Sequence, residues 1–145
     1  MIPKVQLTDK ADPDVRNIIV QGLRAFNAAA TGLPADPPTP LVITLSHPET
    51  GAAIGGLWGY TALQHLFIEL LFVPEALRGE GWGSTLMKTA EAEAVERGCT
   101  GIWLDTFSFQ ARGFYERLGY RVFGELDDFP PRHSRFFLTK RLPAP

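Results

Sequence analysis

The chain has 145 residues, of which 45% are hydrophobic and 11% aromatic, which is enough for one sizeable core. Its 14 Lys and Arg against 16 Asp and Glu give a net charge of -2, so nothing points to nucleic acid as a partner. The single cysteine, Cys99, rules out an internal disulfide and a cysteine-rich zinc site. With no leader-like start and no apolar run of about 18 residues, we expect one cytoplasmic domain, residues 1–145, without membrane or metal.

The N-terminal part predicts a helix followed by a loop. Asp12 and Pro13 are typical of an N-cap and a first helical position. Apolar residues then recur at helical spacing to about Asn27: Val15, Ile18, Ile19, Leu23 and Phe26. Residues 28–40 are rich in Ala, Gly and Pro, which predicts a loop within the domain rather than a linker.

Three strands are expected next. Residues 41–46 and 53–61 predict an antiparallel hairpin around the turn at residues 47–51. Residues 66–73 are almost wholly apolar without alternation, which predicts a central strand buried on both faces and interrupted only by Glu69.

The remainder predicts helices alternating with strands. A helix ended by Gly98 carries Trp82, Leu86, Ala90 and Ala94 on its apolar face. A strand at residues 101–106, a short helix capped by Ser108, and strands at residues 120–126 and 136–142 complete the chain. This order indicates an α/β fold, a mixed sheet with helices on its faces.

The segment Arg78-Gly79-Glu80-Gly81-Trp82-Gly83 lies where a strand gives way to a helix, so its backbone N–H groups are expected to face one concavity at a positive helix end. Glycines let the backbone approach phosphate oxygens, Arg78 adds a cation, and Ser84 and Thr85 add hydroxyls. A pyrophosphate suits this chemistry, although the spacing is neither that of a P-loop nor that of a dinucleotide-binding turn. The alternative is a tight turn with no ligand.

Residues 71–74, Leu-Phe-Val-Pro, are followed by Arg78-Gly79-x-Gly81-x-Gly83, and residues 109–120 contain the pattern aromatic-Tyr-x-x-x-Gly-aromatic. The first motif is similar to the acyl-CoA-binding motif of the GNAT superfamily of N-acyltransferases, and the second is similar to the second signature of that superfamily. The resemblance implies a splayed, mostly antiparallel sheet of about six to seven strands with helices on both faces, and acetyl-CoA as the acyl donor.

The resemblance also assigns roles. The backbone of the central strand would bind the pantetheine arm, and Tyr115, a phenol with an ordinary pKa of about 10, would donate a proton to the leaving sulfur. Alternatively, Tyr115 only pairs with Phe114 in the core. The residues expected to bind acetyl-CoA are Leu71, Phe72, Val73, Arg78, Gly79, Glu80, Gly81, Trp82, Gly83, Ser84, Gln110, Gly113 and Phe114.

Glu69 is the candidate base. A lone carboxylate in an apolar strand is costly to bury unless it faces a cleft or a partner, so it would accept the amine proton or bind a cationic acceptor; a structural hydrogen bond is the alternative. Gly113 inside a helix indicates close approach, either by the cofactor or by another helix. Asp105 and Thr106 are secondary candidates near the expected thioester.

The acceptor is less defined. Asp127, Asp128, Arg132 and Arg135 lie in an expected loop, residues 124–135; its aspartates suit a cationic acceptor and its arginines an acidic one, and a solvated loop is the plainer alternative. No cysteine or serine has a nucleophile setting, so we expect direct transfer to a primary amine of a small molecule in a ternary complex. The alternatives are a peptide or protein amine, a longer acyl donor, or a non-catalytic acyl-CoA sensor. A homodimer through edge strands is also expected.

Overall fold

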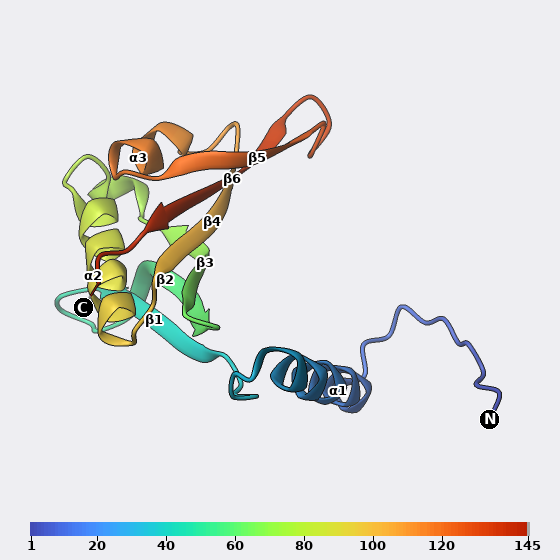
Figure 1. Cartoon of the computed structure of the whole chain (residues 1–145). Helices are drawn as coiled ribbons and strands as arrows, with labels where there is room; N and C mark the ends of the chain where they lie inside the picture. The colour runs from blue at the N-terminus through green and yellow to red at the C-terminus, as the bar shows by residue number, and fades with distance from the viewer. Residues whose placement is uncertain (145) are drawn as a thin grey trace. The chain divides into compact units, whose positions relative to one another are not determined.

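The computed structural model describes residues 1–144, and the chain divides into two compact units, Met1–Pro37 and Pro38–Pro145 (Figure 1). The first unit holds one helix, and the second holds a sheet with its helices. Among the described residues, no helix combines the length and apolar character that a membrane crossing requires.

The helix of the first unit, α1 (Pro13–Thr31), begins where the sequence predicts. The Asp12 carboxylate accepts a hydrogen bond from the Asp14 N–H at 2.9 Å, and Pro13 occupies the first helical turn. The predicted end at about Asn27 is wrong. Residues 28–30 are alanines, which favour helix, so the helix continues until Gly32 adopts a left-handed conformation (φ 73°) and closes it.

The second unit is built on a six-stranded sheet in the order β1-β2-β3-β4-β6-β5. Its strands are β1 (Thr39–Ser46), β2 (Ala53–Ala62), β3 (His65–Phe72), β4 (Gly101–Phe107), β5 (Arg121–Asp127) and β6 (Ser134–Arg141). Only β3 and β4 pair in parallel, so the predicted mixed, mostly antiparallel sheet is confirmed. β1 starts earlier than expected and includes Pro40, which an edge strand tolerates because it leaves some N–H groups unpaired.

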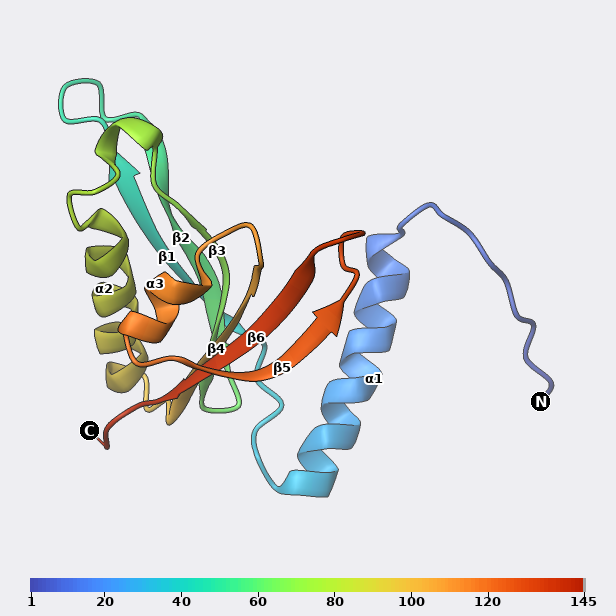
Figure 2. The same cartoon turned by 90° about the horizontal axis from the view of Figure 1, so that it is seen from above.

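Two helices cover one face of this sheet, α2 (Trp82–Glu96) and α3 (Arg112–Arg117), with a short 3₁₀ turn, η1 (Glu75–Leu77), before them (Figure 2). The core lies between α2 and the sheet, where these side chains are buried: Leu86, Met87, Ala90 and Ala94 against Leu66, Ile68, Ile102, Leu104 and Leu138. Ser108 does not cap α3, as the sequence had suggested. The helix starts later, after Ala111, and the Ser108 hydroxyl instead accepts a hydrogen bond from Ser134 N–H.

Close packing fixes glycine at two places in β2. A Cβ on Gly56 would lie 2.1 Å from the Ile43 carbonyl oxygen, and one on Gly59 would lie 2.3 Å from the Phe67 carbonyl oxygen. Both obstacles are backbone atoms of the neighbouring strands, which cannot move aside without breaking the ladder. β2 therefore sits closer to β1 and β3 than side chains at these positions would allow.

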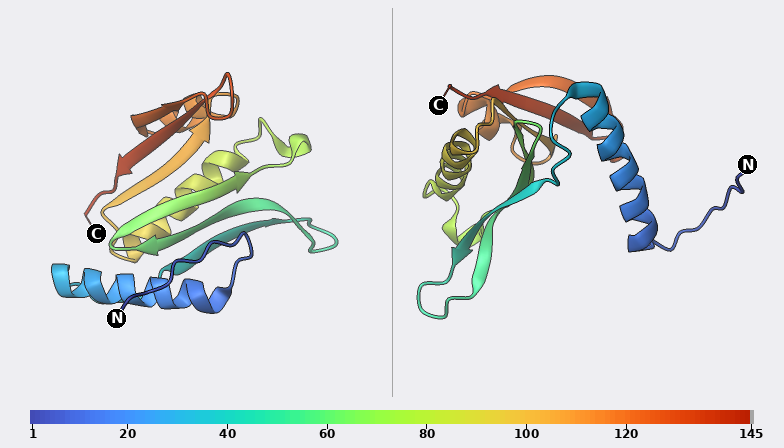
Figure 3. Two further views of the ribbon diagram at one scale, coloured as in Figure 1. Left: turned by 90° about the vertical axis from the view of Figure 1, so that its right-hand side faces the viewer. Right: turned by 60° about the horizontal axis from the view of Figure 1, so that its bottom comes forward.

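The sheet opens between β3 and β4. Their pairing covers only four positions, from His65 with Gly101 to Ile68 with Leu104, and the strands then diverge (Figure 3). At the same place Glu69 forms a β-bulge, because Gly59 faces Ile68 whereas Trp58 faces Leu70.

The expectation that β3 is buried on both faces is therefore wrong beyond Ile68. Leu70 is 61% exposed and Phe72 is 56% exposed. A run of apolar residues indicates a hydrophobic strand, but it does not indicate that the neighbouring strand, β4, diverges from it.

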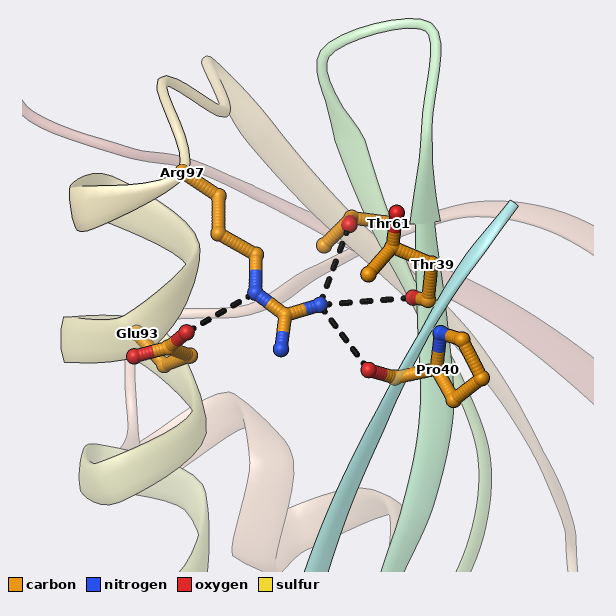
Figure 4. A network of polar contacts seen from close by, with 5 residues as sticks. All are labelled: Thr39, Pro40, Thr61, Glu93 and Arg97. Carbon is orange, nitrogen blue, oxygen red and sulfur yellow. Dashed lines mark hydrogen bonds and ion pairs between the residues drawn. The ribbon is translucent and has the colours of Figure 1, made fainter. Parts of the chain in front are cut away.

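Arg97, at the end of α2, ties this helix to the start of the sheet (Figure 4). One nitrogen, Nη1, donates to the carbonyl oxygens of Thr39 and Pro40 at 3.3 and 3.0 Å and to the Thr61 hydroxyl at 3.2 Å. Nε is held by the Glu93 carboxylate at 2.8 Å. The C-terminal end of α2 is thereby fixed against β1 and β2.

Candidate active site

A cleft of about 940 Å³ lies where β3 and β4 diverge. It is lined by residues 68–73 of β3 and its continuation, by the glycine-rich segment, by the end of β4, and by the turn and helix that follow. Every residue predicted to bind the cofactor or to catalyse lines this cleft except Glu80 and Gly113. Residues of two separate sequence motifs therefore line one continuous cleft.

The glycine-rich segment presents a row of free backbone donors. Within the described chain, the N–H groups of residues 79–84 donate no hydrogen bond, because the first internal bond of α2 runs from Thr85 N–H to the Gly81 carbonyl. Gly79 and Gly81 have φ values of 81° and 86°, which turn the chain so that these groups precede the helix. Unpaired donors at a helix N-terminus form a binding place for an anion.

Side chains fix this segment on both sides. Arg78 Nε donates to the Val73 carbonyl at 3.0 Å, which keeps the guanidinium beside the end of β3. The Glu80 carboxylate accepts a hydrogen bond from the Trp82 indole at 3.2 Å and is not part of the cleft wall. The cation predicted for an anion site is thus present, and the nearby carboxylate is engaged elsewhere.

Gly113 has a different neighbour from the one the sequence suggested. A Cβ there would lie 3.2 Å from Nη1 of Arg117, so the group that approaches Gly113 is a side chain of its own helix. Arg117 in turn lines the cleft. Sequence reasoning missed this second cation, because no local pattern indicates that Arg117 faces the cleft.

Tyr115 is placed at the inner wall of the cleft by aromatic packing. It is 8% exposed and meets Phe114 at 5.1 Å and Tyr120 at 6.1 Å between ring centroids. Tyr120 is itself fixed, since its hydroxyl donates to Glu91 at 2.9 Å. Tyr115 is therefore both a core residue and a residue of the cleft.

The hydroxyl of Tyr115 remains available for chemistry. Within the described chain it makes no hydrogen bond, and no buried side-chain oxygen lacks a partner, so this hydroxyl opens onto the cleft. Burial, and to a lesser degree the negative charge of Asp105, raises the pKa of Tyr115 to about 12. The phenol consequently keeps its proton throughout the neutral range.

Gln110 fastens the end of β4. Its side-chain oxygen accepts hydrogen bonds from the Thr106 hydroxyl at 3.2 Å and from the Phe107 N–H at 2.8 Å. The amide NH₂ of Gln110 is left to donate to a molecule in the cleft, which Gln110 and Thr106 both line.

Two carboxylates mark the point where the sheet opens. Glu69 and Asp105 each follow directly after the last paired residues of β3 and β4, and both line the cleft. Glu69 is exposed, whereas Asp105 is part-buried and accepts hydrogen bonds from Arg135. The sequence treated Arg135 as part of a loop, but residues 124–127 and 134–135 belong to β5 and β6, and only the turn between them is irregular.

A family model described as the acetyltransferase (GNAT) family matches residues 15–120, which is most of the chain. The chain belongs to the GNAT acetyltransferase family. A curated acetyltransferase of Agrobacterium fabrum is 38% identical over 93% of this chain and 96% of its own length. The blasticidin-S acetyltransferase of Streptomyces morookaense is 42% identical over 72% of this chain and 78% of its own length.

Solved structures agree with this assignment. The crystal structure of an acetyltransferase from Agrobacterium tumefaciens matches with a TM-score of 0.87 and 37% identity, and the match covers 97% of this chain and 100% of that chain. The GNAT fold and the acyl-CoA-dependent N-acetyltransferase class, both implied by the two sequence motifs, are therefore confirmed.

Proposed function

We propose that this GNAT acetyltransferase moves the acetyl group of acetyl-CoA to a primary amine of a small molecule, by direct attack within a ternary complex. The observation that carries the proposal is that residues 79 and 81–84, whose backbone donors are free, line the same cleft as Tyr115 with its free hydroxyl. An anion-binding segment and a proton donor in a single cavity match the pyrophosphate and the thioester of one molecule.

The lining of the cleft suits two parts of acetyl-CoA, the pyrophosphate and the pantetheine arm. The pyrophosphate suits the N–H groups of residues 79 and 81–84 together with Arg78 and Arg117. The pantetheine arm suits the side of β3 toward β4 beyond Ile68, where β4 no longer pairs with the backbone groups of β3. Phe114 and Leu71 provide apolar wall along the way.

The reaction assigns one role to each polar side chain. The amine nitrogen forms a bond to the thioester carbon, the carbon–sulfur bond breaks, and Tyr115 gives its proton to the departing sulfur. Glu69, exposed at the bulge of β3, accepts the proton that the amine loses, directly or through water. The Tyr115 phenolate then regains a proton from solvent through the cleft.

A small-molecule acceptor is supported by the match to a blasticidin-S acetyltransferase, which the chain covers over 78% of that protein's length. A peptide amine remains the alternative that an acceptor screen would detect.

The first experiment is calorimetric titration with acetyl-CoA of the wild type, of Arg78→Glu and of Arg121→Glu. Arg121 is exposed on β5, outside the cleft, and serves as the matched charge reversal. We expect Arg78→Glu to weaken binding by about 100-fold, since a charge-assisted phosphate contact is replaced by repulsion, and Arg121→Glu to leave it unchanged.

Turnover is then tested by following CoA release with a panel of amines that includes blasticidin S and short peptides. Acetylation of a small amine supports the proposal, and exclusive acetylation of peptides contradicts its acceptor class. A folded wild type that binds acetyl-CoA but acetylates no amine contradicts its catalytic part.

A further inference from the structure

The sheet of the second unit has a face opposite to α2 and α3, and the opening between β3 and β4 reaches it. Along β4, Leu104 and Thr106 are buried toward the helices, so the alternate residues Asp105 and Phe107 lie on the opposite face. Arg135 of β6 joins them there, because it pairs across the strands with Phe107. This face therefore carries an ion pair, Asp105 with Arg135, at the edge of the cleft.

Aromatic rings surround the guanidinium of Arg135. Its central carbon lies 5.3 Å from the ring centre of Phe107, 5.2 Å from that of Phe129 and 5.6 Å from that of Phe137. These rings exclude water from the guanidinium and strengthen its electrostatic interactions. The side chain is nevertheless 28% exposed, so a ligand can reach it.

Each partner of this ion pair keeps one polar atom that is free to hydrogen-bond a ligand. Nε and Nη2 of Arg135 both approach a single carboxylate oxygen, Oδ1 of Asp105, at 2.9 and 2.7 Å. Within the described chain, neither Oδ2 of Asp105 nor Nη1 of Arg135 makes a hydrogen bond. A purely structural pair gains most from a two-oxygen, two-nitrogen arrangement, which this pair does not adopt.

We propose that Asp105, Arg135 and the rings of Phe107, Phe129 and Phe137 form the acceptor subsite, and that it takes a small zwitterionic amine. The carboxylate of such an acceptor binds Nη1 of Arg135, and its amine end lies toward Oδ2 of Asp105 and toward Glu69. The inference rests on the proposed function, because it places the reactive amine at the mouth of the acetyl-CoA cleft.

Charge and position favour this class over a simple cation. A cation alone would meet the carboxylates of Asp105 and Glu69 but would also meet the positive charge of Arg135 beside them. A zwitterion satisfies both signs at once. The rings around the guanidinium add apolar surface for the body of the acceptor between its two charged ends.

The test compares three probes that share one amine group: benzylamine, 3-(aminomethyl)benzoate and 4-(aminomethyl)benzoate. Binding is measured by calorimetry on the full chain saturated with CoA, so that no turnover is needed. We expect at least one of the two carboxylates to bind the wild type at least about tenfold more tightly than benzylamine, as a charge-assisted hydrogen bond allows.

Arg135→Gln is expected to remove this preference while the affinity for CoA stays unchanged. Arg135→Lys keeps the positive charge and is expected to retain part of the preference. Arg132→Gln, in the exposed turn between β5 and β6, is the matched control and is expected to behave as wild type. Unaltered CoA affinity shows in each case that the variant is folded.

Equal binding of benzylamine and both carboxylates by the wild type overturns the inference, as does a preference that persists in Arg135→Gln. The proposed function is tested separately by acetylation of the same probes. A preference for carboxylates that depends on Arg135, without acetylation of any amine, overturns the proposed function and leaves the subsite standing.

Discussion

Gly83 and Phe114 meet where α2 begins: a Cβ on Gly83 would lie 3.1 Å from Cζ of Phe114. Both residues line the cleft, so a side chain at position 83 would displace the ring within the space that we propose for acetyl-CoA. We expect Gly83→Val to weaken acetyl-CoA binding at least about tenfold, or about 1.4 kcal/mol. Calorimetric titration with acetyl-CoA measures this effect, and Gly22→Ala in α1 is the control. Unchanged affinity in Gly83→Val would show that Phe114 does not border the bound cofactor.

Tyr115→Phe removes only the hydroxyl that opens onto the cleft. Because a general acid contributes about 100-fold or more, we expect kcat to fall by roughly that factor while the Kd for acetyl-CoA stays within about twofold. Single-turnover acetylation of the amine found in the acceptor screen measures the effect. Tyr60→Phe, on the other side of the sheet from α3, is the control, and equal rates for Tyr115→Phe and wild type would remove Tyr115 from the chemistry.

Stability is expected to fall at high pH because of Tyr115. Its pKa is raised to about 12 by burial and by Asp105, whereas an unfolded tyrosine titrates near 10. Between these values the unfolded chain loses a proton that the folded chain keeps, so the free energy of unfolding decreases as pH rises, by about 1 kcal/mol at pH 11.

Urea unfolding from pH 8 to pH 11 measures this slope in the wild type and in Tyr115→Phe. The variant is expected to show a shallower slope but not a flat one, because burial and Glu91 also raise the pKa of Tyr120. Identical slopes in the two proteins would mean that Tyr115 ionises in the folded protein as easily as in the unfolded chain.

Much of the fold and the cleft could be predicted from local patterns. The cap at Asp12, the hairpin, and the two motifs depend on residues close in sequence, and each appears where expected. The exposure of Leu70 and the pairing of Asp105 with Arg135 could not be predicted, since both depend on strand register and on where β3 leaves β4. No local pattern encodes that divergence.

Gly59→Ala is expected to destabilise the protein strongly, because the added Cβ would lie 2.3 Å from the Phe67 carbonyl oxygen. We expect the free energy of unfolding to fall by about 3 kcal/mol or more, because the backbone of the paired strands must shift. Gly22→Ala, in α1 with no atom within 4 Å of the added Cβ, is expected to stabilise by about 0.5–1 kcal/mol. Denaturant midpoints compare the two, and similar shifts would contradict the close approach of β2 and β3.

Arg97→Ala should loosen the attachment of α2 to the edge of the sheet. The three acceptors of Nη1, two carbonyls and the Thr61 hydroxyl, would lose their charged donor. We therefore expect the free energy of unfolding to fall by about 2 kcal/mol. Arg141→Ala, at the exposed end of β6, is the control. Amide exchange in β1 should rise in Arg97→Ala, and unchanged exchange there would show that the strand holds without this contact.

The brief parallel junction between β3 and β4 also bears on the order of folding. β1 to β3 form a meander from neighbours in sequence, β4 to β6 form a second ladder, and only four pairs join the two. The antiparallel pairs β1–β2, β2–β3 and β5–β6 close short loops, whereas the β3–β4 junction and the β4–β6 pairing both close long connections that contain a helix. We expect the hairpins of neighbouring strands to form early and β4 to join them later, so that the cleft between β3 and β4 is completed only late in folding.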